Sequence, residues 1–237
     1  MGFKAWSEML AQALREIDAG VLSKVVLARA CELQRAGGIP IDDALAALNA
    51  EYPECYRFLF EPRPGHAFLG ATPELLLSTS GRAVRSMALA GSQKRGATPE
   101  LDAALERELL ESAKDRREHL IVLDALRERL QPLASVLHTG DTVAMKLRNI
   151  QHLHTPVEAE LRQALGALPL VELLHPTPAL GGAPRDAALS FIRAAEPLTR
   201  GWYAAPVGWL DTQLDGSFCV AIRSAVVQEE RAWLYAG

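Results

Sequence analysis

The chain has 237 residues, of which 49% are hydrophobic and 23% are charged, so it is long and apolar enough to bury a substantial core. This composition excludes an intrinsically disordered chain, a collagen-like repeat and a coiled coil. The 25 Lys and Arg residues and the 29 Asp and Glu residues give a net charge of −4, without the basic excess that is typical of nucleic-acid-binding proteins.

The N-terminal part of the chain predicts two helices, one buried strand and a series of short strands. Residues 6–18 place apolar side chains on one face of a helix, and residues 41–50 predict a second helix with an acidic first turn, which suits the helix dipole. Between them, the β-branched run at residues 21–29 is typical of a buried strand. Residues 56–89 hold short apolar runs separated by turns that contain Pro or Gly, which predicts an antiparallel meander.

Leucines at helical spacing predict that residues 99–130 form one long helix, which ends before Pro132. The remaining elements are expected to be strands at 142–154, 202–210, 218–227 and from 233 onward, and helices at 157–165 and 184–194. Because strands and helices come in runs rather than in strict alternation, we expect an α+β fold with largely antiparallel sheets flanked by helices. The chain has no low-complexity linker and no internal repeat, so residues 1–237 are predicted to form a single domain.

The three cysteines, Cys31, Cys55 and Cys219, lie far apart and form no CxxC pair, which disfavours a zinc ribbon, a thioredoxin-like site and a disulfide framework. The N-terminus lacks the apolar core of a signal peptide, and no apolar run is long enough to span a bilayer. We therefore expect a cytoplasmic protein that binds neither nucleic acid nor membrane and that is a monomer or a weak dimer.

Two titratable residues, Lys24 and Glu74, lie in apolar runs, where a catalytic role would explain the presence of a charged side chain. Lys24 precedes Val25 and Val26 in the first predicted strand, and burial would lower the pKa of its amine, as a general base requires. Glu74 precedes three leucines, and apolar surroundings would raise the pKa of its carboxyl group, as a general acid requires. The alternative is that both side chains face solvent, one from a half-buried strand and the other from the start of a strand.

Two further segments could bind an anionic ligand and a metal ion. In the loop at residues 89–96, Gly91 and Ser92 could bring backbone N–H groups and a hydroxyl close to an anion, although an ordinary turn explains the same residues. In the predicted long helix, Glu118 ends an acidic stripe that begins at Glu111 and could bind magnesium. A solvated helix face with ion pairs is the alternative.

The C-terminal half adds a histidine pair, a rigid loop and an arginine. His152 and His154 point the same way on a strand, but no third ligand has a suitable spacing, so a zinc site is disfavoured. Prolines and glycines make residues 175–182 a rigid loop. Arg223 is a cation on an apolar strand and is suited to a bidentate hold on a carboxylate.

Taken together, these segments resemble the chorismate-utilising enzymes, which include isochorismate, salicylate, anthranilate and aminodeoxychorismate synthases. The resemblance runs from about residue 22 to residue 237 and rests on eight motifs in order. They are KVVLAR, FLGATPELLL, ALAGSQKRG, SAKDRREH, HLHTP, LLHPTPALGG, RGWYAAPVGW and VAIRSA.

The resemblance implies a role for ten residues and a fold of the chorismate-binding type. Lys24 would be the base that activates water, Glu74 the acid that protonates the departing hydroxyl, and Glu118 a magnesium ligand. Arg223 would hold a substrate carboxylate. The other expected substrate-binding residues are Gly91, Ser92, His152, Thr177, Ala179 and Leu180.

The resemblance implies an isochorismate synthase that uses magnesium and serves menaquinone or siderophore biosynthesis. Lys24 favours this reaction, because the ammonia-using members of the family typically have glutamine at that position. A salicylate synthase and an anthranilate or aminodeoxychorismate synthase are the alternatives. The family continues beyond a segment like residues 235–237 to a second magnesium-binding glutamate, and its members carry more sheet ahead of Lys24. The last predicted strand has barely begun at Gly237, so we expect a domain truncated at both ends, and an inactive chorismate-binding fragment is a further alternative.

Overall fold

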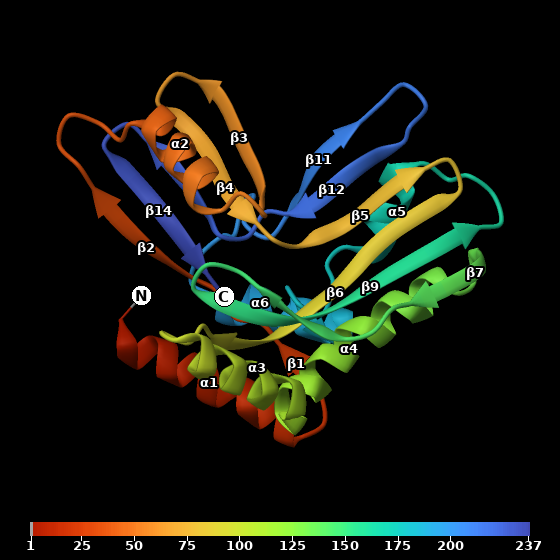
Figure 1. Ribbon diagram of the computed structural model, residues 1–237. Coiled ribbons are helices and arrows are strands. Elements are labelled where there is room, and N and C mark those ends of the chain that lie inside the picture. The colour runs from red at the N-terminus through yellow and green to blue at the C-terminus, as the bar shows by residue number, and fades with distance from the viewer. Residues whose placement is uncertain (1) are drawn as a thin grey trace. The chain divides into compact units, whose positions relative to one another are not determined.

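The computed structural model describes residues 2–237 and has the expected α+β architecture, with antiparallel sheets and flanking helices (Figure 1). The residues group into two compact units, which are described separately. The first unit contains the chain up to Pro73, Leu180–Val207 and Val220–Gly237, and the second contains Glu74–Ala179 and Gly208–Cys219. The expectation that residues 1–237 form a single domain stays a prediction.

The first unit is built on a five-stranded antiparallel sheet with the strand order β2-β14-β13-β4-β3. Its strands are β2 (Arg29–Gln34), β3 (Tyr56–Arg63), β4 (His66–Thr72), β13 (Ser224–Gln228) and β14 (Arg231–Ala236). Helix α2 (Ile41–Glu51) packs on this sheet through Ile41, against Ala67, Leu69 and Val227 of the strands. The helix predicted at 41–50 is confirmed, and its apolar face forms the contact that holds it on the sheet.

A second core of the first unit joins its N-terminal helix to a later one. Helix α1 (Phe3–Asp18) contributes Met9 and Ala13, α6 (Arg185–Ala195) contributes Ile192, and Leu27 lies with them. Next to this core, β1 (Lys24–Val25) and β10 (Gly182–Ala183) form a separate two-stranded antiparallel sheet. This small sheet carries Lys24.

The second unit contains a seven-stranded sheet with the order β11-β12-β5-β6-β9-β7, in which β8 also pairs with β9. The strands are β5 (Leu75–Ser80), β6 (Ala83–Lys94), β7 (Ala134–Thr139), β8 (Val143–Lys146), β9 (Ile150–Leu161), β11 (Pro206–Leu210) and β12 (Gly216–Val220). The helices are α3 (Pro99–Glu111), α4 (Ala113–Leu130) and α5 (Ala167–Leu174). Helix α4 runs along β6 and β9 in Figure 1 and buries Val122, Leu123, Leu126 and Leu130 against the sheet.

Several predicted elements are wrong in their bounds. The predicted helix at 99–130 is two helices, because Ser112 is extended (φ −60°, ψ 112°) and its side chain caps the second helix by accepting from the Asp115 N–H. Of the predicted helix at 157–165, residues 157–161 are the end of β9, in which buried residues alternate with residues that are mostly half-buried. Helix α5 and strand β7 were not predicted.

Other strand predictions are confirmed in type but not in extent. Of residues 21–29, only Lys24–Val25 form β1, and residues 142–154 are divided between β8 and β9. The strand predicted at 218–227 is interrupted at Arg223, where the chain passes from β12 to β13. The last strand, β14, pairs with β13 over Arg231–Leu234 on one side and with β2 over its whole length on the other. None of the helices in residues 2–237 is long and apolar enough to cross a membrane.

Candidate active site

Lys24 is held by the close approach of two backbone segments. Ala183 and Gly182 are the register partners of Lys24 and Val25, and the Ser23 N–H donates to the Ala183 carbonyl oxygen at 2.8 Å. Gly182 has a φ of +139°, and a Cβ atom there would lie 2.1 Å from the Lys24 carbonyl oxygen. Only glycine permits this approach, so the Gly-Gly pair of the 175–182 loop motif fixes the position of half-buried Lys24.

Arg223 occupies an unusual backbone conformation in the same unit. Its φ is +51°, which side-chain-bearing residues rarely adopt, and the Ala71 N–H donates to its carbonyl oxygen at 3.3 Å. Burial lowers the pKa of the Arg223 guanidinium, while Cys55, Tyr52 and Glu54 act in the opposite direction. The arginine is therefore partly desolvated, which strengthens its interaction with any anion it meets.

Glu74 opens the second unit immediately before β5 and is only 4% exposed. The three leucines that follow it are also buried. Burial and the nearby Glu74 carboxylate raise the pKa of the Cys219 thiol to about 12. Glu74 is therefore a buried residue, and the solvent-facing alternative is wrong.

A β-bulge at Gly91 brings the substrate-binding loop predicted from sequence against helix α4. Ala90 pairs with Leu153 and Ser92 pairs with His152, so Gly91 is the extra residue in β6, and its φ is +76°. A Cβ atom at Gly91 would lie 3.1 Å from the Asp115 Cβ atom. Beyond the bulge, the Ser92 Oγ and His152 Nδ1 atoms lie 2.8 Å apart, within hydrogen-bond distance.

Glu118 lies on α4 next to His119, which sequence reasoning did not select. His119 is 2% exposed, and its Nδ1 and Nε2 atoms lie 3.2 Å from the Ala90 carbonyl oxygen and 2.7 Å from the Thr155 hydroxyl. This buried imidazole therefore joins the helix turn that carries Glu118 to the strand residue that precedes the Gly91 bulge. A histidine within the SAKDRREH motif was the available signal, but its buried partners come from distant strands.

The residues can supply part of a magnesium site. Within residues 2–237, no three His, Cys, Asp or Glu side chains gather as a metal-binding group. Asp115 accepts from the Ser112 hydroxyl at the helix start, and Glu118 is a half-buried carboxylate one turn further on. A single carboxylate fits magnesium, because this ion keeps several waters and is commonly completed by substrate oxygens.

Thr177 is a buried residue of the 175–182 loop whose hydroxyl has no hydrogen-bond partner among the described residues. It is 3% exposed. A buried hydroxyl without a partner is costly, which makes a ligand or a water at this position physically reasonable. Ala179 is half-buried and Leu180 is buried in the same loop.

The ten predicted residues fall in both units. Lys24, Leu180 and Arg223 belong to the first unit, and the others belong to the second. Within the second unit, the structure brings Gly91, Ser92 and His152 together at the β6–β9 pairing.

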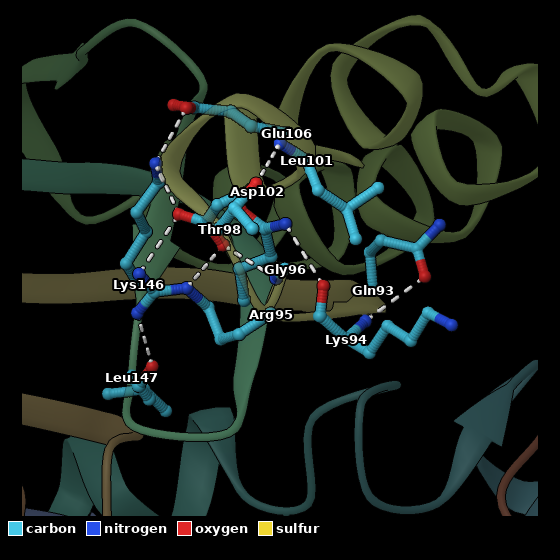
Figure 2. A network of polar contacts seen from close by, with 11 residues as sticks. Gln93, Lys94, Arg95, Gly96, Thr98, Leu101, Asp102, Glu106, Lys146 and Leu147 are labelled. Atoms are coloured by element: carbon cyan, nitrogen blue, oxygen red, sulfur yellow. Dashed lines mark hydrogen bonds and ion pairs between the residues drawn. The ribbon is translucent and has the colours of Figure 1, made fainter. Parts of the chain in front are cut away.

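A polar network at the end of β6 was not predicted, because residues 89–96 were expected to form a loop, whereas β6 continues to Lys94. Figure 2 shows Asp102, which is 7% exposed, between the side chains of Arg95 and Lys146. Arg95 donates to both Asp102 oxygens, at 2.7 and 2.9 Å, and Lys146 donates at 3.0 Å. The side-chain hydrogen bond from Arg95 is the main cause that holds the pKa of Asp102 well below its usual range. The network ties the start of α3 to the strand that carries Ser92.

Comparison with known proteins gives consistent matches over the whole chain. A family profile described as "Chorismate binding enzyme" matches residues 1–237. The salicylate biosynthesis isochorismate synthase of Pseudomonas aeruginosa is 43% identical over 236 residues, which are 99% of this chain and 49% of that protein. Isochorismate synthase MenF of Bacillus subtilis is 41% identical over 98% of this chain and 49% of its own length.

A solved structure agrees with these sequence matches. The menaquinone-specific isochorismate synthase MenF from Escherichia coli superposes with a TM-score of 0.95 at 34% identity, over 100% of this chain and 55% of that one. The chain thus spans about half the length of the relatives that it matches.

Proposed function

Because the chain belongs to the chorismate-binding enzyme family, we propose that it binds chorismate and carries the machinery that converts chorismate to isochorismate. The relatives from P. aeruginosa and B. subtilis are named as isochorismate synthases, which supports this reaction over the other reactions of the family. The observation that carries the proposal is the burial of Glu74, which is 4% exposed, because burial disfavours the charged form of a carboxyl group and so suits it to be a proton donor.

The proposed reaction exchanges one ring hydroxyl for another through water. Lys24 accepts a proton from a water molecule as the water oxygen bonds to one ring carbon. The ring double bonds shift, and the carbon–oxygen bond of a second ring carbon breaks. Glu74 donates its proton to that departing hydroxyl, which leaves as water, so one water is consumed and one is released.

Other residues would hold the two carboxylates of the substrate and its ring. Arg223, partly desolvated, is suited to a bidentate hold on one carboxylate. The Gly91 bulge, with Ser92 and His152 hydrogen-bonded across the strands, would lie beside the ring. Glu118, water and substrate oxygens would hold a magnesium ion, which when bound supplies positive charge to the anionic substrate.

Chorismate turnover by the chain with magnesium tests the proposal, with products separated by liquid chromatography and mass spectrometry. We expect isochorismate. Salicylate with pyruvate would instead indicate the salicylate synthase reaction, and anthranilate formed with ammonia but without isochorismate would overturn the assignment. If calorimetry shows that chorismate binds but no product forms, the chain would be a chorismate-binding module. This outcome is an alternative because the chain spans about half the length of these relatives.

Matched variants separate the proposed acid and base from the rest of the surface. Removal of either group is expected to reduce kcat about 10²–10⁴-fold. Lys24→Ala is compared with Lys4→Ala, because the Lys4 side chain is 91% exposed, and Glu74→Gln is compared with Glu158→Gln, because the Glu158 side chain is 58% exposed. Equal activity of a variant and its control would remove the role assigned to that residue.

A further inference from the structure

Glu196 and Arg200, just beyond the C-terminus of α6, form an ion pair that is nearly buried. The Glu196 side chain is 2% exposed and the Arg200 side chain is 18% exposed. Arg200 donates from Nε to Glu196 Oε2 at 2.8 Å and from Nη2 to Glu196 Oε1. Such a bidentate pair fixes the plane of the guanidinium group and so directs its other N–H groups.

The pair also binds backbone groups of two distant segments. Arg200 donates from Nη2 to the Val26 carbonyl oxygen at 2.7 Å and from Nη1 to the Leu180 carbonyl oxygen at 2.9 Å. Glu196 Oε1 accepts from the Ala28 N–H at 2.7 Å. One side-chain pair therefore satisfies three backbone groups.

These backbone groups lie on the two segments that hold Lys24. Val26 and Ala28 lie two and four residues after Lys24, and Leu180 lies two residues before Gly182, which pairs with Val25 next to Lys24. The two-stranded sheet of β1 and β10 has only two residues in each strand and is outside both larger sheets. A two-stranded sheet of this kind is at best marginally stable alone, so it depends on additional contacts.

We propose that Glu196 and Arg200 are positioning residues for Lys24. Their ion pair binds both the segment that continues the Lys24 strand and the segment that leads into the strand paired with it. The catalytic part of this inference rests on the proposed function, whereas the positioning of the strand does not. A base displaced by about 1 Å can lose about 10²-fold in rate. The pair therefore acts on the reaction through Lys24 and makes no contact with substrate in this scheme.

Two conservative variants test the proposal without deleting a side chain. Arg200→Lys keeps the positive charge but cannot donate to Glu196, Val26 and Leu180 together. Glu196→Gln keeps the side-chain volume and an acceptor for the Ala28 N–H but loses the charge, and it serves as the test if the first variant does not fold. The control is Arg82→Lys. Arg82 forms an ion pair with Glu160 at 2.7 Å, but both side chains are about half exposed and belong to the second unit, so the change should not affect the Lys24 strand.

Two measurements read the position of Lys24 without any reaction. Hydrogen exchange of residues 22–28 is expected to be at least tenfold faster in both variants than in the wild type. Acylation of the Lys24 amine, measured by mass spectrometry relative to exposed Lys4, is expected to increase. The Arg82→Lys control is expected to change neither quantity.

Turnover of chorismate gives the third measurement. We expect kcat to fall about 10- to 100-fold in Arg200→Lys and Glu196→Gln, with KM within about threefold of the wild type, because the substrate-holding groups are retained. If the wild type forms no isochorismate, the proposed reaction fails for this chain, while exchange and acylation still test the positioning. Folded variants with wild-type exchange at 22–28 and wild-type Lys24 acylation would overturn the inference, even if their melting temperatures were lower.

Discussion

Replacement of Gly91 by alanine tests whether the β6 bulge is held tightly against helix α4. The φ of Gly91 is +76°, so alanine adopts a left-handed conformation there, which costs about 1–2 kcal/mol. The added Cβ atom would also lie 3.1 Å from Asp115 Cβ, 3.2 Å from the Asp115 carbonyl oxygen and 3.3 Å from Leu153 Cδ1. Three contacts of this kind crowd a packed site, and overpacking costs about 1–3 kcal/mol. Together these two costs predict a loss of about 2–5 kcal/mol in the free energy of unfolding.

Gly81 provides the matched control in the same unit. Its φ is +57°, but a Cβ atom there would meet nothing within 4 Å, so Gly81→Ala carries only the conformational cost of about 1–2 kcal/mol. The gain from a less flexible unfolded chain is common to both variants and cancels in the comparison. The difference between the two therefore measures the contact of the bulge with α4 and Leu153.

Urea unfolding followed by circular dichroism gives both free energies of unfolding. Because both glycines belong to the second unit, the same cooperative transition reports on both. We expect Gly91→Ala to be less stable than Gly81→Ala by at least about 1 kcal/mol. Equal stability of the two variants would show that β6 is not held against α4 at this position.

Three further predictions concern protonation, thiol reactivity and the metal. Hydrogen bonds, first of all from Arg95, lower the pKa of Asp102, so the stability that they give is present above about pH 4 and is lost as the pH falls towards the pKa of the folded state. Asp102→Asn should therefore make the free energy of unfolding in urea depend less on acid pH, and an unchanged pH dependence would contradict this. Iodoacetamide should label exposed Cys31 in the native protein, and the other two thiols, whose pKa values burial raises, only after unfolding, as seen by mass spectrometry. Glu118→Gln should weaken magnesium binding in calorimetry in the presence of chorismate, whereas Glu128→Gln, on an exposed residue of the same helix, should not; equal affinities would exclude Glu118 as a ligand.

Local patterns predicted the elements that one amphipathic face defines. The helices at 41–51 and 185–195 were expected within one residue of their bounds, because their apolar stripes face a single core. The break at Ser112 was missed because the leucine spacing continues across it, and only the cap of α4 stops the helix there. The second half of β9 was mistaken for a helix because its alternation is short.

The sequence motifs predicted which residues belong to the candidate site, but not which of these residues contact one another. The motifs selected Ser92 and His152 separately, 60 positions apart, and only the bulged pairing of β6 with β9 joins them. The contact of Arg200 with Val26 spans 174 positions and follows from the fold. Short-range spacing contains no information about such contacts, because they depend on strand register and helix docking.

The exchange of hydroxyl groups through water is the central claim, and solvent labelling tests it most directly. Chorismate is converted by the protein with magnesium in water enriched in oxygen-18, and the isochorismate formed is analysed by mass spectrometry. Attack by a water that Lys24 activates predicts one solvent oxygen in each product molecule, and labelled product that forms about 10²–10⁴-fold more slowly with the Lys24→Ala variant. Isochorismate that contains no solvent oxygen would show that the hydroxyl moves within the substrate, and would contradict the roles assigned to Lys24 and Glu74.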